Sequence, residues 1–223
     1  MNKRQIKDLL YSHVAQIGKA LSSPKRLELI ELLSQSPKTV EALAQETSME
    51  VKLTSAHLKA LKIARLVQAD RDGKFMVYRL TGDDVAKLWV NLRKTAAEHL
   101  VEFSSDVVRL LAHPEKLTSI NREQLAALAK SGDVIVIDVR PAAEFEVAHL
   151  PYARSMPMAE LSRRLDELPK DTEIVAYCRG PFCIFADEAL ELLRAKGYRA
   201  FKTMDGINEW VAAGLPVELN NVP

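Results

Sequence analysis

The sequence predicts two domains, a mainly α winged helix-turn-helix followed by an α/β domain built on a parallel sheet. The length of 223 residues suits two ordinary domains. The first half has the pattern of helices followed by a β-hairpin and a further helix, whereas the second half alternates strands with helices. His113-Pro114 is expected to end the first half, because proline disfavours helix at the residue before it. We therefore predict domains at 1–112 and 113–223.

The composition is that of a soluble globular protein, with 48% hydrophobic and 27% charged residues. No stretch approaches the roughly 18 consecutive apolar residues of a membrane span. The first residues are charged but precede no long apolar run, so they do not resemble a signal peptide. We expect a cytoplasmic protein with no membrane partner.

The charge is distributed unevenly between the two halves. Residues 1–112 hold 18 Lys and Arg against 13 Asp and Glu, while residues 113–223 hold 13 against 17. A net charge of +5 beside one of −4 favours a nucleic-acid partner for the first half. A difference of this size could also arise by chance, so it only supports the argument from motifs.

Each predicted element of the first half follows from a local signal. Apolar spacing predicts a helix at 2–20, and Ser23-Pro24 predicts the next helix start, with a capping hydroxyl and proline in the first turn. Thr39 is expected to cap a short helix that ends near Gln45. The remaining predicted elements are a helix at 50–64, strands at 66–70 and 75–80 joined by Arg71-Asp72-Gly73-Lys74, and a long amphipathic helix at 83–111.

The helix at 50–64 is the predicted recognition helix of the winged helix-turn-helix. Thr54, Leu58 and Leu61 share the face expected to pack inward. A polar face at spacings of 3, 4 and 3 can place side chains on phosphates and base edges, and the hairpin can reach the flanking backbone. A lysine stripe is more often a solvated helix face, but the order of elements favours DNA binding. The predicted DNA contacts are Lys52, Ser55, Lys59 and Lys62 on the helix and Arg71 and Lys74 on the wing.

The first half of the sequence resembles the arsenic-repressor (ArsR) family of regulators. The resemblance rests on ALSSPKRLELI at 20–30, SAHLKAL at 55–61 and VYRL at 77–80. It implies a homodimer formed by the helices at 2–20 and 83–111, a two-fold operator in double-stranded DNA, and repression that an inducer relieves. His57 is then expected to orient the helix or contact a phosphate. Two positions depart from the family, since Val51 replaces a usually polar base-reading residue and Arg65 replaces a glycine.

The metal sites of this family are not reproduced in the sequence. The helix near 39–46 has no cysteine, and the last helix offers only His99 and Glu102, with no histidine beside Asp84. Two ligands do not complete a tetrahedral zinc site. We expect no metal and no cofactor.

The second half predicts a parallel sheet covered by helices on both faces. The strand VIVID at 134–138 is apolar throughout, as buried parallel strands are. The other predicted elements are helices at 121–131, 183–196 and 206–213 and strands at 173–177 and 200–204.

Both cysteines of the chain lie in one predicted loop between a strand and a helix. A loop at a helix N-terminus directs N–H groups and positive potential toward its centre, so Cys178 is expected to be a reactive thiolate. The alternative is a buried cysteine that packs as a small apolar residue. Arg179 is expected to add positive charge, and Gly180, Pro181 and Phe182 complete the loop before Cys183.

The second half resembles the rhodanese-like sulfurtransferases. The matching motifs are IDVR at 137–140 with EF at 144–145, AHLPYA at 148–153, VAYCR at 175–179, GINEW at 206–210 and AGLPV at 213–217. The resemblance implies that Cys178 attacks the sulfane sulfur of a small donor and holds it as a persulfide. Asp138 and Arg140 are expected to support the edge of the pocket, and His149 to order the loop after the first strand.

One departure changes the expected substrate. Many rhodaneses have an arginine five residues after the nucleophile, where this chain has Cys183. The loss of that charge argues against thiosulfate as donor. The absence of an arginine six residues after Cys178, where Ile184 stands, argues against a phosphatase. A second thiol could instead attack a persulfide or sulfenate on Cys178 and close a disulfide or polysulfide bridge. The alternative is that Cys183 merely begins a helix.

Three functions fit the sequence. The first is a regulator whose rhodanese-like domain receives reactive sulfur and thereby changes operator affinity. The second is a sulfurtransferase whose N-terminal module serves mainly dimerisation. The third is a regulator whose catalytically silent domain binds another anion, such as arsenate. The lysine face and the wing favour the first over the second, and Cys178 in its loop disfavours the third.

Overall fold

The computed structural model describes residues 1–110 and 114–219, apart from the side chains of residues 108 and 114. The chain divides into two compact units, Met1–Trp89 and Val90–Pro223. The boundary predicted at 112/113 falls among residues 111–113, outside the described residues, and stays a prediction.

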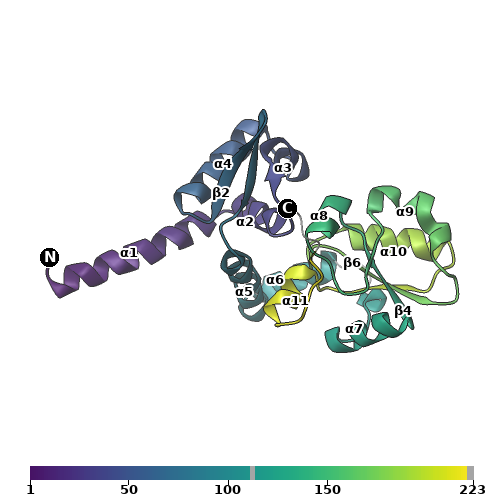
Figure 1. Ribbon diagram of the computed structural model, residues 1–223. Coiled ribbons are helices and arrows are strands. Elements are labelled where there is room, and N and C mark those ends of the chain that lie inside the picture. The colour runs from purple at the N-terminus through teal and green to yellow at the C-terminus, as the bar shows by residue number, and fades with distance from the viewer. Residues whose placement is uncertain (111–113, 220–223) are drawn as a thin grey trace. The chain divides into compact units, whose positions relative to one another are not determined.

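The first unit is a winged helix-turn-helix, as predicted (Figure 1). Its three strands form an antiparallel sheet in the order β1-β3-β2. Strand β1 was not predicted, because two residues are too short for an apolar pattern. The elements are α1 (Lys3–Leu21), α2 (Pro24–Leu33), β1 (Lys38–Thr39), α3 (Val40–Glu46), α4 (Val51–Ile63), β2 (Val67–Asp72), β3 (Phe75–Leu80) and the start of α5 (Asp83–His99).

Side-chain caps explain where two of these helices begin. Asn2 and Gln5 form a reciprocal capping box at α1. The Thr39 hydroxyl accepts a hydrogen bond of 3.2 Å from the Ala42 N–H at α3, as predicted. At α2 the prediction was half right, because proline occupies the first turn but the Ser23 side chain makes no capping bond.

The wing turn is shorter than predicted. Asp72 pairs with Phe75, so Gly73 and Lys74 alone connect the strands and Arg71 lies within β2. Gly73 has φ +56°, which a two-residue hairpin turn requires and glycine adopts without steric cost.

The core of the first unit fixes the orientation of α4. Leu58 and Leu61 are fully buried, together with Leu29 and Ile30 of α2 and Leu43 of α3. Thr54 is also fully buried, which confirms the predicted inward face. The opposite face of α4 is consequently directed to solvent.

The long helix predicted at 83–111 is interrupted. Helix α5 ends at His99, and a separate helix α6 runs over Val101–Leu110. The Ser104 hydroxyl donates to the carbonyl of Ala97 at 3.0 Å. A side chain that bonds a backbone carbonyl in this way competes with regular helix. The prediction of one continuous helix was therefore wrong, and its expected end at Leu111 lies outside the described residues.

The second unit is an α/β domain with a four-stranded parallel sheet in the order β5-β4-β6-β7, which confirms the predicted class. Beyond α5 and α6, its elements are η1 (Pro114–Lys116), α7 (Arg122–Ser131), β4 (Val134–Asp138), α8 (Ala142–Val147), β5 (Arg154–Ser155), α9 (Met158–Arg164), η2 (Leu165–Glu167), β6 (Glu173–Tyr177), α10 (Phe185–Ala195), β7 (Ala200–Lys202) and α11 (Ile207–Ala212).

Both faces of this sheet are covered. Alternate residues of β4, such as Ile135 and Ile137, pack with apolar residues of α9 and α10. Val134 and Val136 pack on the other face with Leu125 of α7 and with α11. Figure 1 shows α7 and α10 on opposite sides of the strands. Strand β6 is central, so its C-terminal end, where the cysteine loop begins, is held from both sides.

Candidate functional site

The polar face of α4 is accessible in the first unit. Lys52, Lys59 and Lys62 are exposed, whereas Ser55 and His57 are half-buried. Their predicted roles at DNA are compatible with this placement and stay predictions.

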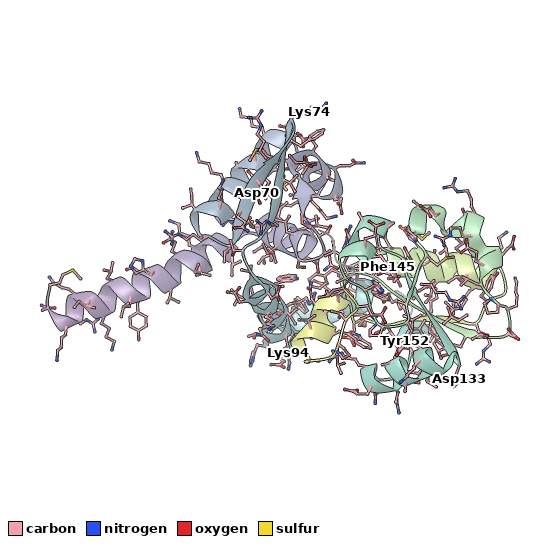
Figure 2. The ribbon with its side chains drawn as sticks, viewed as in Figure 1. Asp70, Lys74, Lys94, Asp133, Phe145 and Tyr152 are labelled. Carbon is pink, nitrogen blue, oxygen red and sulfur yellow. A yellow bond between two sulfur atoms is a disulfide. The ribbon has the colours of Figure 1, made fainter. Side chains whose placement is uncertain are left out.

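The wing presents Arg71 and Lys74, its two predicted DNA contacts, to solvent. The Arg71 Nε donates to the carbonyl of Gly73 at 3.0 Å, and the Lys74 ammonium lies 5.1 Å from the centre of the Phe75 ring. Figure 2 shows Lys74 at the tip of the hairpin. Both side chains are exposed, as contacts to a flanking phosphate backbone would need.

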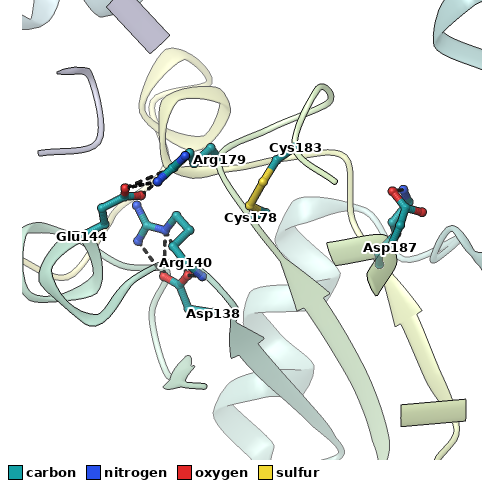
Figure 3. Close-up of a disulfide and its surroundings, with 8 residues drawn as sticks. Asp138, Arg140, Glu144, Cys178, Arg179, Cys183 and Asp187 are labelled. Atoms are coloured by element: carbon teal, nitrogen blue, oxygen red, sulfur yellow. Dashed lines mark hydrogen bonds and ion pairs between the residues drawn. A yellow bond between two sulfur atoms is a disulfide. The ribbon is translucent and has the colours of Figure 1, made fainter. Parts of the chain in front are cut away.

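The cysteine loop begins where β6 ends. The structure joins Cys178 and Cys183 in a disulfide, with their Cα atoms 6.1 Å apart (Figure 3). Cys178 is only 2% exposed and packs among Ile137, Val139 and Ala186, while Cys183 is half-buried against the same cluster. The closed loop therefore withholds the predicted nucleophile from solvent.

Glycines allow the loop to pack tightly on the start of α11. A Cβ at Gly206 would lie 2.7 Å from the carbonyl oxygen of Cys178 and from that of Arg179. Gly180 has φ +139°, and its carbonyl accepts a hydrogen bond of 3.2 Å from the Cys183 N–H. Close backbone contact therefore packs residues 178–180 against the start of α11.

Arg179 is directed away from the loop centre. Its guanidinium pairs with Glu144 of α8, with Nη2 and Oε1 2.5 Å apart (Figure 3). Glu144 is fully buried, and the Arg179 side chain is 10% exposed. This pairing offsets the positive potential that the sequence led us to expect from Arg179, because a buried carboxylate lies beside it. No motif or spacing in the sequence indicates Glu144 as its partner, because the two residues are 35 positions apart.

Asp138 and Arg140 form a buried network under the loop. The Asp138 carboxylate accepts bonds from the Arg140 guanidinium and from the Tyr177 hydroxyl, and Arg140 Nη2 also donates to the carbonyl of Ala148 at 2.7 Å. Burial raises the pKa of Tyr177 well above its usual value, and the negative charge of Asp138 adds to the rise. Burial lowers the pKa of Arg140, but attraction to Asp138 outweighs this and leaves the pKa raised.

This network lies in the interior of the domain and does not line a cavity near the cysteine loop. Asp138 and Arg140 are fully buried and line neither of the two cavities near the loop. His149, in turn, bonds the Phe145 carbonyl at 3.0 Å and Glu218 at 3.1 Å through its two ring nitrogens. These contacts tie the segment after α8 to the last described residues.

Two cavities lie beside the loop, and Cys178 lines neither of them. One, of about 380 Å³, is lined by Pro181 and Phe182 together with residues of α5 and α6. The other, of about 480 Å³, is lined by Val139, Met158 and Phe185 among others. An entering donor would thus reach Cys178 only after the loop rearranges.

The described residues contain neither a cluster of metal ligands nor a membrane-spanning helix. No group of three or more His, Cys, Asp or Glu side chains in residues 1–110 and 114–219 is arranged to hold a metal ion. No helix in the part of the chain that the structure describes is long and apolar enough to cross a membrane.

The fold and the loop define a winged helix-turn-helix protein that carries a rhodanese-like α/β domain. The family model described as bacterial regulatory protein, arsR family, matches residues 23–69, and the model of the rhodanese-like domain matches residues 121–213. Both resemblances drawn from the sequence are thereby confirmed.

A relative similar over nearly its whole length shows the family. The chain is 41% identical over 212 residues to the HTH-type transcriptional regulator Rv0324 of Mycobacterium tuberculosis, covering 95% of this chain and 93% of the relative. The chain therefore belongs to the ArsR-family transcriptional regulators that carry a rhodanese-like domain.

Other relatives match one half each. A sulfurtransferase of Allochromatium vinosum is 34% identical over 103 residues, 45% of this chain and 94% of that protein. The solved homodimeric winged helix-turn-helix domain of Mb0332 from Mycobacterium bovis is 41% identical and covers 46% of this chain and 93% of that one, with a TM-score of 0.42.

Proposed function

We propose that this regulator is a cytoplasmic repressor whose rhodanese-like domain responds to reactive sulfur through Cys178, with Cys183 as the second thiol. The observation that carries the proposal is the bond between the two Sγ atoms inside a six-residue loop. A pair that can close in this way has two covalent states, and a repressor needs two states with different operator affinity.

The chemistry takes two balanced steps. In the first, the Cys178 thiolate attacks the outer sulfur of an organic persulfide, forms Cys178–S–SH after proton uptake, and releases the donor's thiolate. In the second, the Cys183 thiolate attacks the Cys178 Sγ, forms the disulfide, and expels hydrosulfide. Both cysteines are oxidised, and the sulfane sulfur leaves reduced.

The surroundings of the loop favour a donor whose charged groups lie away from its reactive sulfur. Arg179 is already paired with Glu144, and Cys183 occupies the position where many rhodaneses have a donor-binding arginine. The thiol pair also lies against an apolar cluster that includes Val139 and Phe185. An alkyl or peptidyl persulfide suits this environment better than thiosulfate does.

DNA binding is assigned to the exposed face of α4 and to the wing, acting in a homodimer on a two-fold operator. Apolar side chains on α1 and α5 that are exposed in the single chain support the dimer, because exposed apolar surface of this extent marks an interface. They are Ile6, Leu9, Leu10 and Val14 of α1 and Leu88 and Leu92 of α5.

The test compares operator binding before and after donor treatment. The reduced protein selects its operator from a random DNA pool, and glutathione persulfide is then added to the complex. We expect release from DNA by the wild type and no release by Cys178→Ser. Cys183→Ser should accumulate the persulfide, seen as one added sulfur by intact mass spectrometry, without closing a disulfide. A normal response from Cys178→Ser would refute the proposal.

A sulfurtransferase enzyme is the second candidate, favoured by the match to the Allochromatium vinosum sulfurtransferase. Steady-state transfer of sulfur from persulfide to cyanide discriminates between the two. An enzyme should turn over many times with weak, salt-sensitive and sequence-independent DNA binding. A regulator should transfer sulfur about once per chain and bind its operator selectively.

A further inference from the structure

Phe182 lies between the two cysteines and projects toward helices α5 and α6. Its ring centre is 5.7 Å from that of Phe103 and 5.4 Å from the guanidinium carbon of Arg93. All three residues belong to the second compact unit. The side chain next to the second thiol is therefore stacked on a cation of α5.

Arg93 also contacts the element on which the cysteine loop rests. Its guanidinium pairs with Glu209 of α11, and both side chains are 7% exposed. The other carboxylate oxygen of Glu209 accepts a hydrogen bond of 2.8 Å from the Gly206 N–H. Gly206 is the residue packed directly against the carbonyl of Cys178.

The loop backbone itself reaches the same ion pair. A Cβ at Gly180 would lie 3.2 Å from Glu209 Oε2 and 3.3 Å from Arg93 Nη1. Arg93 thus meets the cysteine loop at Gly180 and at Phe182, and its partner Glu209 holds the backbone beneath Cys178. Such short contacts leave little room for the loop to move without displacing Arg93.

We propose that Phe182 and Arg93 transmit the state of the Cys178–Cys183 pair to helix α5. Closure of the disulfide fixes Phe182, the residue just before Cys183, on the Arg93 guanidinium, and reduction releases it. Helix α5 begins at Asp83, three residues after the end of wing strand β3, so it connects the second unit along the chain to the DNA-binding elements. Closure of the disulfide by reactive sulfur rests on the proposed function, whereas the contact between Phe182 and Arg93 does not.

The physical requirement is a contact that differs between the two covalent states. A disulfide closes the segment from Cys178 to Cys183 into a ring and restricts where Phe182 can lie. Without the bond, the Cys183 end of the loop is constrained by backbone contacts alone. Arg93 is a positioning residue in this scheme, because it touches neither sulfur.

Hydrogen exchange on the full-length protein tests the contact directly. One sample is reduced with tris(2-carboxyethyl)phosphine, and the other is closed with oxidised glutathione, which takes up the two electrons and leaves as two glutathione thiols. We expect the amides of α5 between Val90 and Ala97 to exchange more slowly in the closed protein. Equal exchange in the two states would overturn the proposal.

Two conservative variants distinguish a role of Arg93 and Phe182 in transmission from a role in folding. Arg93→Lys keeps a cation for Glu209 but loses the planar guanidinium that stacks on Phe182, and Phe182→Leu keeps an apolar side chain without a ring. Both should close the disulfide as completely as the wild type by intact mass. Lys94→Gln, at an adjacent position whose side chain is 71% exposed, is the matched control.

Operator affinity is the second readout. Closing the disulfide should change the Kd of the wild type and of Lys94→Gln by about fivefold or more, within the usual range of allosteric coupling. In Arg93→Lys and Phe182→Leu the change should fall below about twofold. Full responses in both variants would contradict the proposal, even if hydrogen exchange differed.

The two proposals fail differently. If persulfide donors do not modify Cys178 but glutathione-closed protein still protects α5, the sulfur response is wrong and the coupling stands. If donors close the disulfide and release DNA while both variants respond normally, the sulfur response stands and the coupling is wrong.

Discussion

The backbone conformation or the buried hydrogen bonds of single residues affect the free energy of unfolding of this protein. Arg65, two residues after the end of α4, has φ +57°, in the left-handed region where a side chain is disfavoured. Its carbonyl nevertheless accepts a hydrogen bond of 2.9 Å from the Thr81 hydroxyl. The family resemblance placed a glycine at this position, and the backbone explains that preference.

Arg65→Gly should stabilise the first unit by about 1 kcal/mol, because glycine adopts this φ without the cost that other residues incur. Urea unfolding of the variant measures the gain. Arg65→Ala is the control, since it removes the same side chain and charge but keeps the strained backbone. Equal stability of the two variants would show that the guanidinium, and not φ, determines the effect.

Tyr177→Phe should destabilise the second unit by about 1–3 kcal/mol, because Asp138 and the Leu150 N–H each lose a buried partner. Thermal unfolding checks this value. Tyr152→Phe, at a residue that is 50% exposed, is the control and should change stability little.

The same tyrosine predicts a pH dependence. Because the pKa of Tyr177 is raised in the folded state, its contribution is present below pH 10.0, the ordinary pKa, and is lost as the pH rises further. The unfolded chain then releases the proton while the folded chain retains it. Between pH 9 and pH 11 the wild type should therefore lose more stability than Tyr177→Phe, and parallel curves would contradict the assignment.

Helix α4 and the wing are the elements that we propose to contact DNA. Helix α4 is oriented by the buried Thr54, Leu58 and Leu61, which leaves its lysines on the solvent side. The turn at Gly73-Lys74 exposes Arg71 and Lys74 at the end of the hairpin. Phosphate contacts from such positions supply affinity that depends on salt.

Lys59→Ala should weaken operator binding at low salt and reduce the slope of log K against log salt by about 2, because each protomer of the homodimer loses one phosphate contact. Fluorescence anisotropy titrations at several salt concentrations measure both quantities. Lys130→Ala on α7 removes the same charge from an exposed position outside the winged helix-turn-helix and should leave the slope unchanged. A slope that Lys59→Ala does not alter would remove this lysine from the interface.

Most elements could be predicted from the sequence because their signals are local. The apolar strand at 134–138, the Thr39 cap and the Asp-Gly hairpin each depend on residues close together in the chain. The break near Leu100 could not be predicted, since neither proline nor glycine marks it and a bond from the Ser104 hydroxyl accompanies it.

The candidate site could be predicted only where its residues lie close together in the chain. Cys178 and Cys183 are five positions apart and follow a strand, so their pairing could be proposed from spacing. The Arg179–Glu144 pair spans 35 positions and the Arg93–Glu209 pair spans 116, and no periodicity or motif links either pair. Only the folded chain brings these charges together.

The whole molecule joins a winged helix-turn-helix unit to a unit that holds a thiol pair able to close into a disulfide. Each unit has its own core, and helix α5 belongs in part to both. A regulator of this kind requires a difference in operator affinity between the two thiol states, with a coupling free energy of about 1–3 kcal/mol.

The most direct test measures bound DNA and cysteine chemistry in the same sample. Fluorescence anisotropy follows a labelled operator during glutathione persulfide treatment, and aliquots quenched by alkylation give the fraction of closed disulfide by intact mass. We predict that the fraction of DNA released rises together with the fraction of Cys178–Cys183 disulfide, and that reduction restores the free thiols and the binding to DNA. Complete release while both cysteines remain free thiols, or full closure with DNA still bound at unchanged affinity, would contradict this prediction.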